Sequence, residues 1–312
     1  MKASNITSAI STLIDSKIPS FIWGATGIGK SSLVKKIAAD KKIELMELRL
    51  AQMNRIDFRD TSLLPKEGVG ILFLDELDGL PDVLHTFISQ LILDRQLGEY
   101  KLPDAWSIVA AGSDAGKMPT SLVNAFVHLD MEVDVNDWKD WAFGSGIDER
   151  IIAYIAYKNE DLLNANAKQQ EKSYATPRSW ENVHKILRSG MDEVLLLDVI
   201  AGAIGKECAT SFMSFSATAH KLPDIEAILS KGEAEYPSEK DVLYTLSSVL
   251  VSFLLNYPDE QNLENVLKYI LELEAEFSVM IVQDLQRLGV SMEDSEAFSV
   301  WRSKFAKKIE ER

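Results

Sequence analysis

The hydrophobic pattern of the chain up to residue 134 is that of a sheet with intervening helices. Short, continuous apolar runs are typical of strands that are buried on both faces of a parallel sheet. Runs in which apolar and polar residues alternate are typical of strands with one exposed face. The continuous runs are at residues 20–23, 69–74 and 106–112, and the alternating runs are at residues 43–50 and 127–133. The pattern predicts an α/β fold with a five-stranded parallel sheet, in which the strand at 43–50 lies near an edge.

Helical spacing replaces the strand pattern beyond residue 134 and continues to the end of the chain. Further helices are predicted over residues 151–157, 195–215, 241–255, 263–288 and 295–310. The segment Gly144-Ser145-Gly146 breaks the chain and is a candidate domain boundary. We therefore predict a sheet domain over residues 1–143, an all-helical domain over 144–235 and a C-terminal helical extension over 236–312, which packs on the second domain or on a neighbouring subunit.

Composition restricts the class of protein. Of the 312 residues, 46% are hydrophobic and 26% are charged, which is typical of a soluble globular protein. The net charge of −15 argues against broad capture of nucleic acid, because an acidic surface repels a phosphate backbone. Cys208 is the only cysteine, so an intrachain disulfide is excluded, which suits a reducing cytoplasm. The longest apolar region, residues 242–255, is too short to span a bilayer, so we expect a cytoplasmic protein without a membrane segment.

A glycine-rich segment joins the first predicted strand to the next predicted helix. It reads Gly24-Ala25-Thr26-Gly27-Ile28-Gly29-Lys30-Ser31-Ser32, which has the spacing of a phosphate-binding loop. The glycines let backbone N–H groups and the positive end of the helix approach an anion. Lys30 would reach the terminal phosphates, and the Ser31 hydroxyl would bind Mg²⁺. A glycine turn without a ligand is the alternative; the strand before the segment and the helix after it favour a site for ATP and Mg²⁺.

Two acids follow the continuous apolar run at residues 69–74, namely Asp75 and Glu76. In a nucleotide-binding α/β fold, the carboxyl ends of parallel strands converge on the ligand. Asp75 would then hold Mg²⁺ through water, and Glu76 would polarise the attacking water as a general base. Acids that only cap the next turn would give the same pattern. The strand at residues 106–112 ends at Ser113, whose polar side chain is expected at the same edge.

A cation stands at the start of a predicted helix in the second domain. Thr176 is the expected N-cap and Pro177 the first helical residue, so Arg178 lies in the first turn. A positive charge there opposes the helix dipole, which indicates an anionic partner. An exposed or salt-bridged arginine fits the position equally well, so the position alone does not decide between them.

Together, these motifs resemble the MoxR branch of the AAA+ ATPases, close to bacterial and phage members often encoded beside von Willebrand A-type proteins. The resemblance covers residues 8–215, and its motifs are at residues 24–31, 72–77, 98–106, 110–112, 118–119 and 175–180. It implies an αβα nucleotide-binding domain over residues 1–143 and a helical lid over 144–235. It also implies a ring of identical subunits, a hexamer with ATP between subunits, that remodels a partner protein, for which a von Willebrand A-domain protein is a candidate.

The resemblance also assigns roles to residues. It implies that Lys30 and Ser31 bind phosphate and Mg²⁺, that Asp75 binds Mg²⁺, that Glu76 activates water and that Arg178 is the sensor arginine of the lid. Two positions that act on the transferring phosphate depart from the family pattern.

Ser113 stands where the family has asparagine, and its shorter side chain makes it a weaker candidate for holding the attacking water. Ala125 stands where the family has the arginine finger that reaches a neighbour's ATP site. Arg150 and Arg95 are candidates to replace that finger from a neighbouring subunit, although neither matches a family motif. Withholding such a finger slows hydrolysis by about 10³- to 10⁵-fold, whereas nucleotide binding need not suffer equally.

Three hypotheses about function follow. The first is a ring ATPase that couples ATP binding and hydrolysis to the remodelling or assembly of a partner protein, and an intact Asp75-Glu76 pair favours it. The second is a nucleotide-dependent scaffold with little or no hydrolysis, which the absence of arginine at residue 125 favours. The third is a motor that acts on DNA, which the net charge of −15 opposes.

Overall fold

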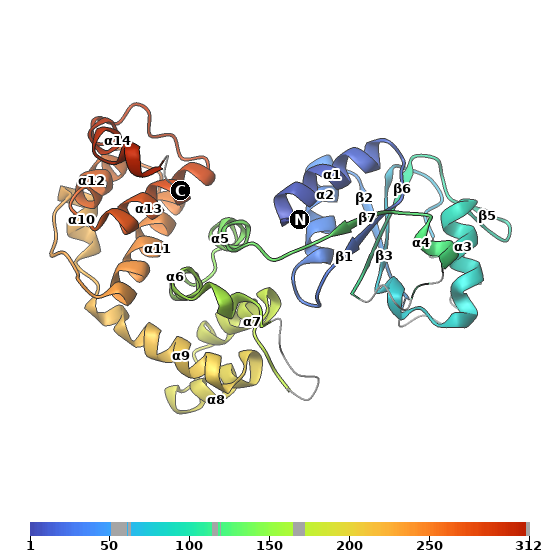
Figure 1. Cartoon of the computed structure of the whole chain (residues 1–312), viewed down its shortest axis with the longest axis horizontal. Helices are drawn as coiled ribbons and strands as arrows, with labels where there is room; N and C mark the ends of the chain where they lie inside the picture. Colours follow the sequence, from blue (N-terminus) through green and yellow to red (C-terminus); the bar gives the residue numbers. More distant parts are fainter. Residues whose placement is uncertain (51–60, 62–63, 114–117, 119, 165–171, 310–312) are drawn as a thin grey trace. The chain divides into compact units, whose positions relative to one another are not determined.

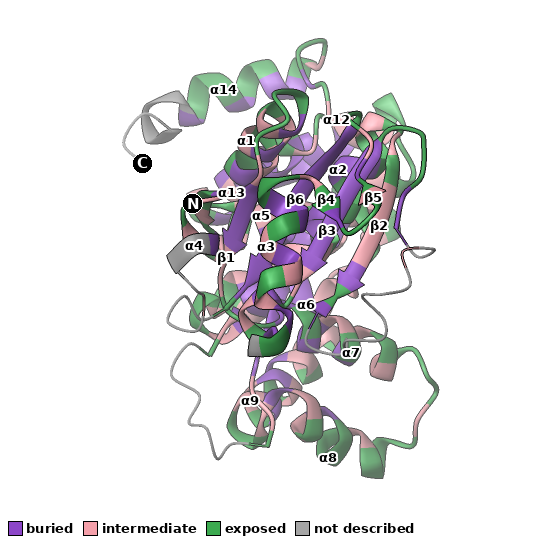
Figure 2. Cartoon of the chain, turned by 90° about the vertical axis from the view of Figure 1, so that its right-hand side faces the viewer, coloured by how far each residue is buried: buried purple, intermediate pink, exposed green. Residues whose placement is uncertain are grey.

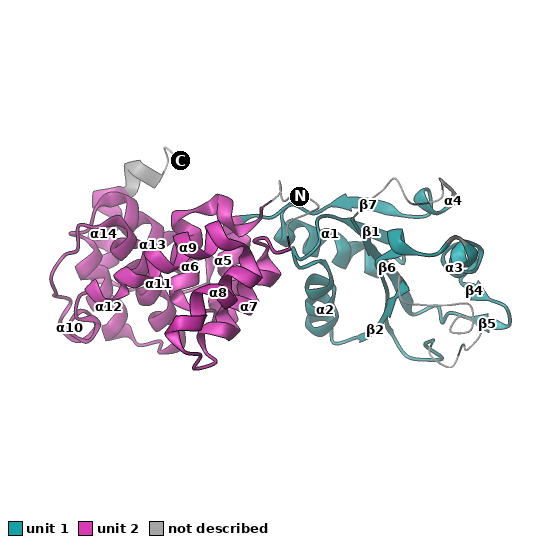
Figure 3. Cartoon of the chain, turned by 90° about the horizontal axis from the view of Figure 1, so that it is seen from below, with its two compact units in different colours: residues 1–134 teal, residues 135–312 magenta. Residues whose placement is uncertain are grey.

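The computed structural model in Figure 1 describes residues 1–50, 61, 64–113, 118, 120–164 and 172–309. Within the motif at residues 118–119, residue 119 lies outside this described part. The chain forms two compact units, Met1–Asp134 and Val135–Arg312, which Figure 3 shows in different colours. We call them the first and the second unit and describe each by itself.

A five-stranded parallel sheet forms the centre of the first unit, as the hydrophobic pattern predicts. Its strands lie in the order β2-β3-β6-β1-β7, so the alternating segments β2 and β7 form the two edges. The strands are β1 (Ser20–Trp23), β2 (Glu44–Arg49), β3 (Gly70–Asp75), β6 (Trp106–Gly112) and β7 (Val127–Asp130). The fold is thus an α/β P-loop fold, and the prediction of its class is confirmed.

Helices cover both faces of this sheet. Helices α1 (Ala3–Asp15) and α2 (Lys30–Lys41) lie on one face, and α3 (His85–Leu93) lies on the other (Figure 1). The sheet and α3 enclose a core that includes Phe21, Leu72 and Ile88, and the central strands are buried in Figure 2. A short antiparallel hairpin precedes β6, in which β4 (Gln96–Leu97) pairs with β5 (Tyr100–Lys101). Three short helical elements complete the described unit: η4 (Leu77–Gly79), η5 (Asp82–Leu84) and α4 (Thr120–Val123).

The described part of the second unit is helical. Its elements are α5 (Val135–Gly144), α6 (Glu149–Tyr157), η7 (Asn159–Leu162), α7 (Pro177–Leu187), α8 (Glu193–Ile204), α9 (Lys206–Ser216), η8 (Ala217–Lys221), α10 (Ile225–Lys231), α11 (Lys240–Asn256), α12 (Glu260–Ile270), α13 (Ala275–Arg287) and α14 (Glu296–Ile309). Of the helices that the structure describes, none combines the length and the apolar character needed to cross a membrane.

Two segments that were each predicted as one helix are helix pairs, so those predictions were wrong. The segment 195–215 breaks at Gly205, whose φ of 87° lies outside the helical region. The segment 263–288 breaks between Ile270 and Ala275, where Leu271-Glu272-Leu273-Glu274 contains neither glycine nor proline. Apolar periodicity continues through both breaks, so spacing alone does not reveal them.

The first helix of the second unit is fastened by buried charges. Lys139 of α5 is 4% exposed, and its Nζ lies 2.5 Å from Oδ2 of Asp284 on α13. Arg287 donates to Asp284 and, over 3.1 Å, to Asp140. Burial lowers the pKa of Lys139, and the Asp284 carboxylate opposes that shift. These contacts explain why α5 belongs to the second unit, whereas we expected the boundary after it, at residue 143. The division of the helical part at residue 235 stays a prediction.

We predict that Asp284→Asn lowers the free energy of unfolding by about 3–5 kcal/mol, because it leaves the buried Lys139 ammonium without its carboxylate. Urea unfolding of the full chain, followed by tryptophan fluorescence, measures the loss. The matched control is Lys185→Met, which breaks an ion pair with Glu181 on the surface of α7 and should change stability little. Equal effects of the two variants would contradict the prediction.

Candidate functional site

The predicted phosphate-binding loop connects β1 to α2 along the carboxyl edge of the sheet. Gly27 and Gly29 have φ angles of 82° and 102°, which other residues adopt only with strain. Gly29 is the N-cap of α2, and no side-chain hydrogen bond caps the helix there. Backbone N–H groups at a helix N-terminus form an anion-binding site. The local geometry is that of a phosphate cradle.

The remaining residues of the loop occupy different depths. Ala25 and Thr26 are exposed, Ile28 is buried beneath the loop, and Ser32 is exposed on α2. Gly24 begins the loop, and its N–H donates to the Gly112 carbonyl at the end of β6 over 3.2 Å. The start of the loop is therefore held by the neighbouring strand.

Lys30, the first residue of α2, folds its side chain back over the loop. Its Nζ donates to the carbonyl oxygens of Gly24 and Ala25, over 2.6 and 3.0 Å. An ammonium group has three donors and no acceptor, so phosphate oxygens can take the place of these carbonyls. The amine is thus held above the cradle that would receive the phosphates.

Ser31 and Asp75, the two predicted Mg²⁺ ligands, are in direct contact. The Ser31 hydroxyl donates to Oδ2 of Asp75 over 2.8 Å, although 44 residues separate them. Hydroxyl and carboxylate oxygens suit Mg²⁺, which keeps several waters and takes few protein ligands. Across the described residues, no cluster of three or more His, Cys, Asp or Glu side chains forms an all-protein metal site. The oxygen pair therefore fits Mg²⁺ bound together with a phosphate.

Glu76 directly follows β3 and has a left-handed backbone, with φ 57° and ψ 41°. For a residue other than glycine, this conformation costs roughly 1–2 kcal/mol. Its N–H donates to Oδ1 of Asp75 over 3.1 Å, and the residue is exposed. Backbone strain of this kind concentrates at functional sites. The strain turns the chain sharply at the carboxyl edge, just where a general base was predicted.

Ser113 has a partner that the sequence analysis missed. The backbone N–H and the hydroxyl of Ser113 both donate to Oδ2 of Asp78, over 2.9 and 3.1 Å. Asp78 lies in η4, three residues after Asp75. The sequence shows Asp78 at the end of the acidic run Asp75-Glu76-Leu77-Asp78. The spacing of apolar residues gives no sign that this carboxylate contacts the end of a different strand. The predicted catalytic residue Ser113 is thus held by a carboxylate.

Ala125, at the expected finger position, is partly buried against the core of the first unit. Arg95, one proposed substitute, donates Nη2 to the carbonyls of Pro103 and Trp106, over 2.9 and 2.7 Å. Its guanidinium therefore holds the β4–β5 hairpin to the start of β6. Reaching another subunit would break both of these bonds.

Arg150 of α6, the other proposed substitute, is also engaged. It binds both carboxylate oxygens of Asp148, over 2.9 and 2.7 Å. Burial alone would raise the pKa of Asp148, but the bonds from Arg150 outweigh it and lower that pKa. This two-bond geometry is among the strongest that arginine forms with a carboxylate.

Arg178 of α7 is exposed, and its helix begins as predicted. Thr176 caps the helix, its hydroxyl accepts from the Ser179 N–H over 3.0 Å, and Pro177 is the first helical residue. Among the residues that the structure describes, none forms an ion pair with Arg178. Arg178 lies in the second unit.

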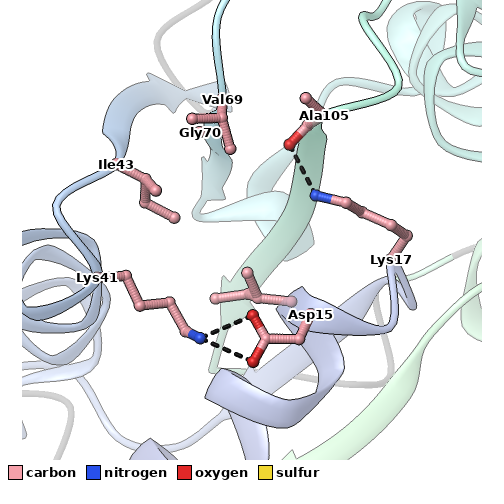
Figure 4. A pocket seen from close by; sticks show the side chains of 8 residues that line it. Asp15, Lys17, Lys41, Ile43, Val69, Gly70 and Ala105 are labelled. Carbon is pink, nitrogen blue, oxygen red and sulfur yellow. Dashed lines mark hydrogen bonds and ion pairs between the residues drawn. The ribbon is translucent and has the colours of Figure 1, made fainter.

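A separate pocket of about 180 Å³ lies at the opposite end of the sheet, beside the amino end of β3 (Figure 4). Lys41 pairs there with Asp15 over 2.8 Å, and Lys17 donates to the Ala105 carbonyl over 2.7 Å. Both ammonium groups that line the pocket already have protein acceptors. We therefore assign no ligand to it.

No protein-family model matches the sequence, and no curated protein matches it. A solved structure of the RuvB Holliday junction branch migration motor of Thermotoga maritima is 17% identical, with 92% of this chain and 87% of that chain covered and a TM-score of 0.43. NtrX of Brucella abortus, solved in complex with ADP, is 15% identical, with 98% and 68% covered and a TM-score of 0.43. Likeness at this identity concerns the fold alone, so the site is interpreted from its own residues.

We predict that Glu76→Gly stabilises the protein by roughly 0.5–1 kcal/mol, because the relief of left-handed strain exceeds the entropy cost of glycine. Urea unfolding of the full chain measures the gain. Lys42→Gly is the matched control, since Lys42 has φ 54° at the end of α2, away from the loop, and should give a similar gain. A loss of stability in Glu76→Gly alone would contradict the strain argument.

Proposed function

We propose that the chain is an ATP-binding P-loop ATPase of the MoxR-like AAA+ type that its motifs resemble. The hydrogen bond between the Ser31 hydroxyl and the Asp75 carboxylate carries the proposal. It joins the phosphate-binding loop to the acidic end of β3, which is the pairing that Mg²⁺-dependent phosphoryl transfer requires. A chance glycine turn has no reason to place its serine on a distant carboxylate.

Binding of the nucleotide rests on the loop. The loop that begins at Gly24 would surround the phosphates with its N–H groups from Ala25 to Ser32, and Lys30 would exchange two carbonyl oxygens for phosphate oxygens. Ser31 and Asp75 would hold Mg²⁺, which would neutralise part of the negative charge that develops on the phosphate. The cofactors of the proposal are therefore ATP and Mg²⁺.

Hydrolysis rests on Glu76. Its carboxylate follows Asp75 directly at the carboxyl edge of the sheet, and its backbone strain favours a functional role. A carboxylate there would accept a proton from water as the water attacks the terminal phosphate. Ser113, held by Asp78, would help to place that water.

Assembly is the finer part of the proposal. A ring of identical subunits, with ATP between neighbours, would bring an arginine of one subunit to the phosphates of another. Ala125 cannot supply it, and Arg95 and Arg150 are engaged within the subunit. The exposed Arg178, which forms no ion pair with a described residue, is a candidate for a separate phosphate contact, as the sensor arginine of the lid that the resemblance implies. By the same resemblance, the ring would be a cytoplasmic hexamer that remodels a partner such as a von Willebrand A-domain protein.

A nucleotide-dependent scaffold is the second candidate function. The position expected to supply an arginine to a neighbour's phosphate is Ala125. The two proposed substitutes, Arg95 and Arg150, are hydrogen-bonded within their own subunit. Without a finger, hydrolysis falls by about 10³- to 10⁵-fold, while the grip of the loop on the nucleotide persists. ATP would then hold the assembly together with little turnover.

We predict that Lys30→Ala weakens ADP binding by roughly tenfold to a hundredfold, since it removes a charged hydrogen-bond donor. Glu76→Gln should retain binding and lower kcat by about 10²-fold or more. Isothermal calorimetry and a phosphate-release assay at high protein concentration measure the two quantities. Lys36→Ala, an exposed lysine on the same helix, is the control.

These measurements separate the two candidate functions. A wild-type rate above that of Glu76→Gln supports the ATPase. Tight binding with a wild-type rate equal to that of Glu76→Gln supports the scaffold. If neither ADP nor ATP binds, and Lys30→Ala behaves as the wild type, the proposal of a nucleotide site fails.

Arg178→Ala should lower kcat by roughly tenfold to a hundredfold, the value of one charge-assisted hydrogen bond to phosphate. It should leave thermal stability unchanged, because the side chain is exposed and has no ion pair with a described residue. Arg188→Ala, at the other end of the same helix, is the matched control and should retain the wild-type kcat. Equal rates in both variants would remove Arg178 from the proposal.

A further inference from the structure

The Asp78 carboxylate closes over the end of β6. Its Oδ2 accepts both the N–H and the hydroxyl of Ser113, over 2.9 and 3.1 Å. A Cβ atom on Gly112 would lie only 2.7 Å from Oδ1 of the same carboxylate. Both oxygens of Asp78 thus lie against Gly112 and Ser113, and the approach requires glycine at residue 112.

This contact stands at the phosphate end of the sheet. Leu74 of β3 lies beside Ala110 of β6, so Glu76 and Ser113 both follow the carboxyl ends of neighbouring strands. The Gly112 carbonyl, one residue before Ser113, accepts the N–H of Gly24 at the start of the phosphate-binding loop. Ser113 is therefore adjacent to the loop on one side and to the strand that carries Glu76 on the other.

The chemistry of Asp78 sets the direction of the Ser113 hydroxyl. A carboxylate only accepts hydrogen bonds, so the hydroxyl must donate its hydrogen to Asp78. The hydroxyl oxygen then presents its lone pairs to the site and can only accept there. Asparagine, which the family has at this position, offers N–H donors as well as an acceptor oxygen.

We propose that Asp78 is a positioning residue that fixes Ser113 as a hydrogen-bond acceptor for the attacking water. The inference rests on the proposed ATPase function. One water hydrogen is bound by Ser113, and the other passes to Glu76 as the water oxygen bonds to the terminal phosphorus. The bond from that phosphorus to the leaving ADP oxygen breaks in the same displacement. Ser113 and Glu76 together orient the lone pair of the water toward phosphorus.

The test is a double-mutant cycle of Asp78→Asn and Ser113→Ala in the full chain. An asparagine at residue 78 can donate to the Ser113 oxygen and so remove its acceptor character. Each variant should lower kcat by roughly tenfold to a hundredfold while KM and ADP affinity stay unchanged, because water placement acts on the transition state. The double variant should be no slower than the slower single variant, since both changes remove the same function.

Ser107→Ala is the matched control. Ser107 lies on β6, the strand that ends just before Ser113. Its buried hydroxyl donates to the Ile14 carbonyl over 2.9 Å, at the opposite end of the sheet. It should lose stability and retain the wild-type kcat. Amide hydrogen exchange gives a readout that does not depend on turnover: Asp78→Ala should expose the Ser113 N–H to exchange, whereas Ser107→Ala should not.

Failure of this inference differs from failure of the proposed function. If the wild type turns over and Asp78→Asn leaves kcat unchanged, or changes KM and kcat together, the inference alone is overturned. Additive losses in the double variant also overturn it, because they show independent roles. A wild type that binds ATP without turnover overturns both the hydrolysis and the inference.

Discussion

The hydrogen bond from the Ser31 hydroxyl to the Asp75 carboxylate is the contact on which the arrangement of the candidate site at the carboxyl edge of the sheet depends. It joins the helix that follows β1 to the end of β3, although β6 lies between these two strands in the sheet. Between them, β6 ends in Ala110-Ala111-Gly112, and a Cβ atom on Gly112 would lie 2.7 Å from Oδ1 of Asp78. A larger side chain at residue 112 would displace the Asp78 carboxylate, which lies next to these acids in the sequence.

Features that are local in sequence were predictable. The strand, glycines and helix around Lys30 follow each other along the chain. The apolar run before Asp75 stops at that acid, so the end of the strand can be located from the sequence. The five-stranded sheet followed from the same periodicities. The contact between Asp78 and Ser113 could not be predicted, because it joins the turn after β3 to the end of β6. The apolar spacing of neither segment indicates which residue of the other it will contact. The helix breaks near residues 205 and 271 were missed for a related reason, since apolar spacing runs through them.

The arginines show a different limit of sequence reasoning. Arg95 and Arg150 were candidates only because of their charge and their place in the chain. Their side chains turn out to serve two carbonyls and one carboxylate, and such contacts depend on residues that are near only after folding. The helix start at Arg178 was predictable from Thr176 and Pro177, which are its immediate neighbours.

Lys30 would also affect the release of a nucleotide from the proposed site. Its ammonium lies within hydrogen-bonding reach of the Gly24 and Ala25 carbonyls, so departing phosphate oxygens can be replaced at once by acceptors of the loop itself. On release, the amine would exchange phosphate oxygens for carbonyl oxygens and keep its hydrogen bonds. Without these carbonyls, the ammonium would be left without acceptors in a partly buried site, which would cost several kcal/mol. In the proposed ATPase, the same carbonyls would compete with the phosphates for the amine, which would lower the affinity and ease the exchange of product for new substrate.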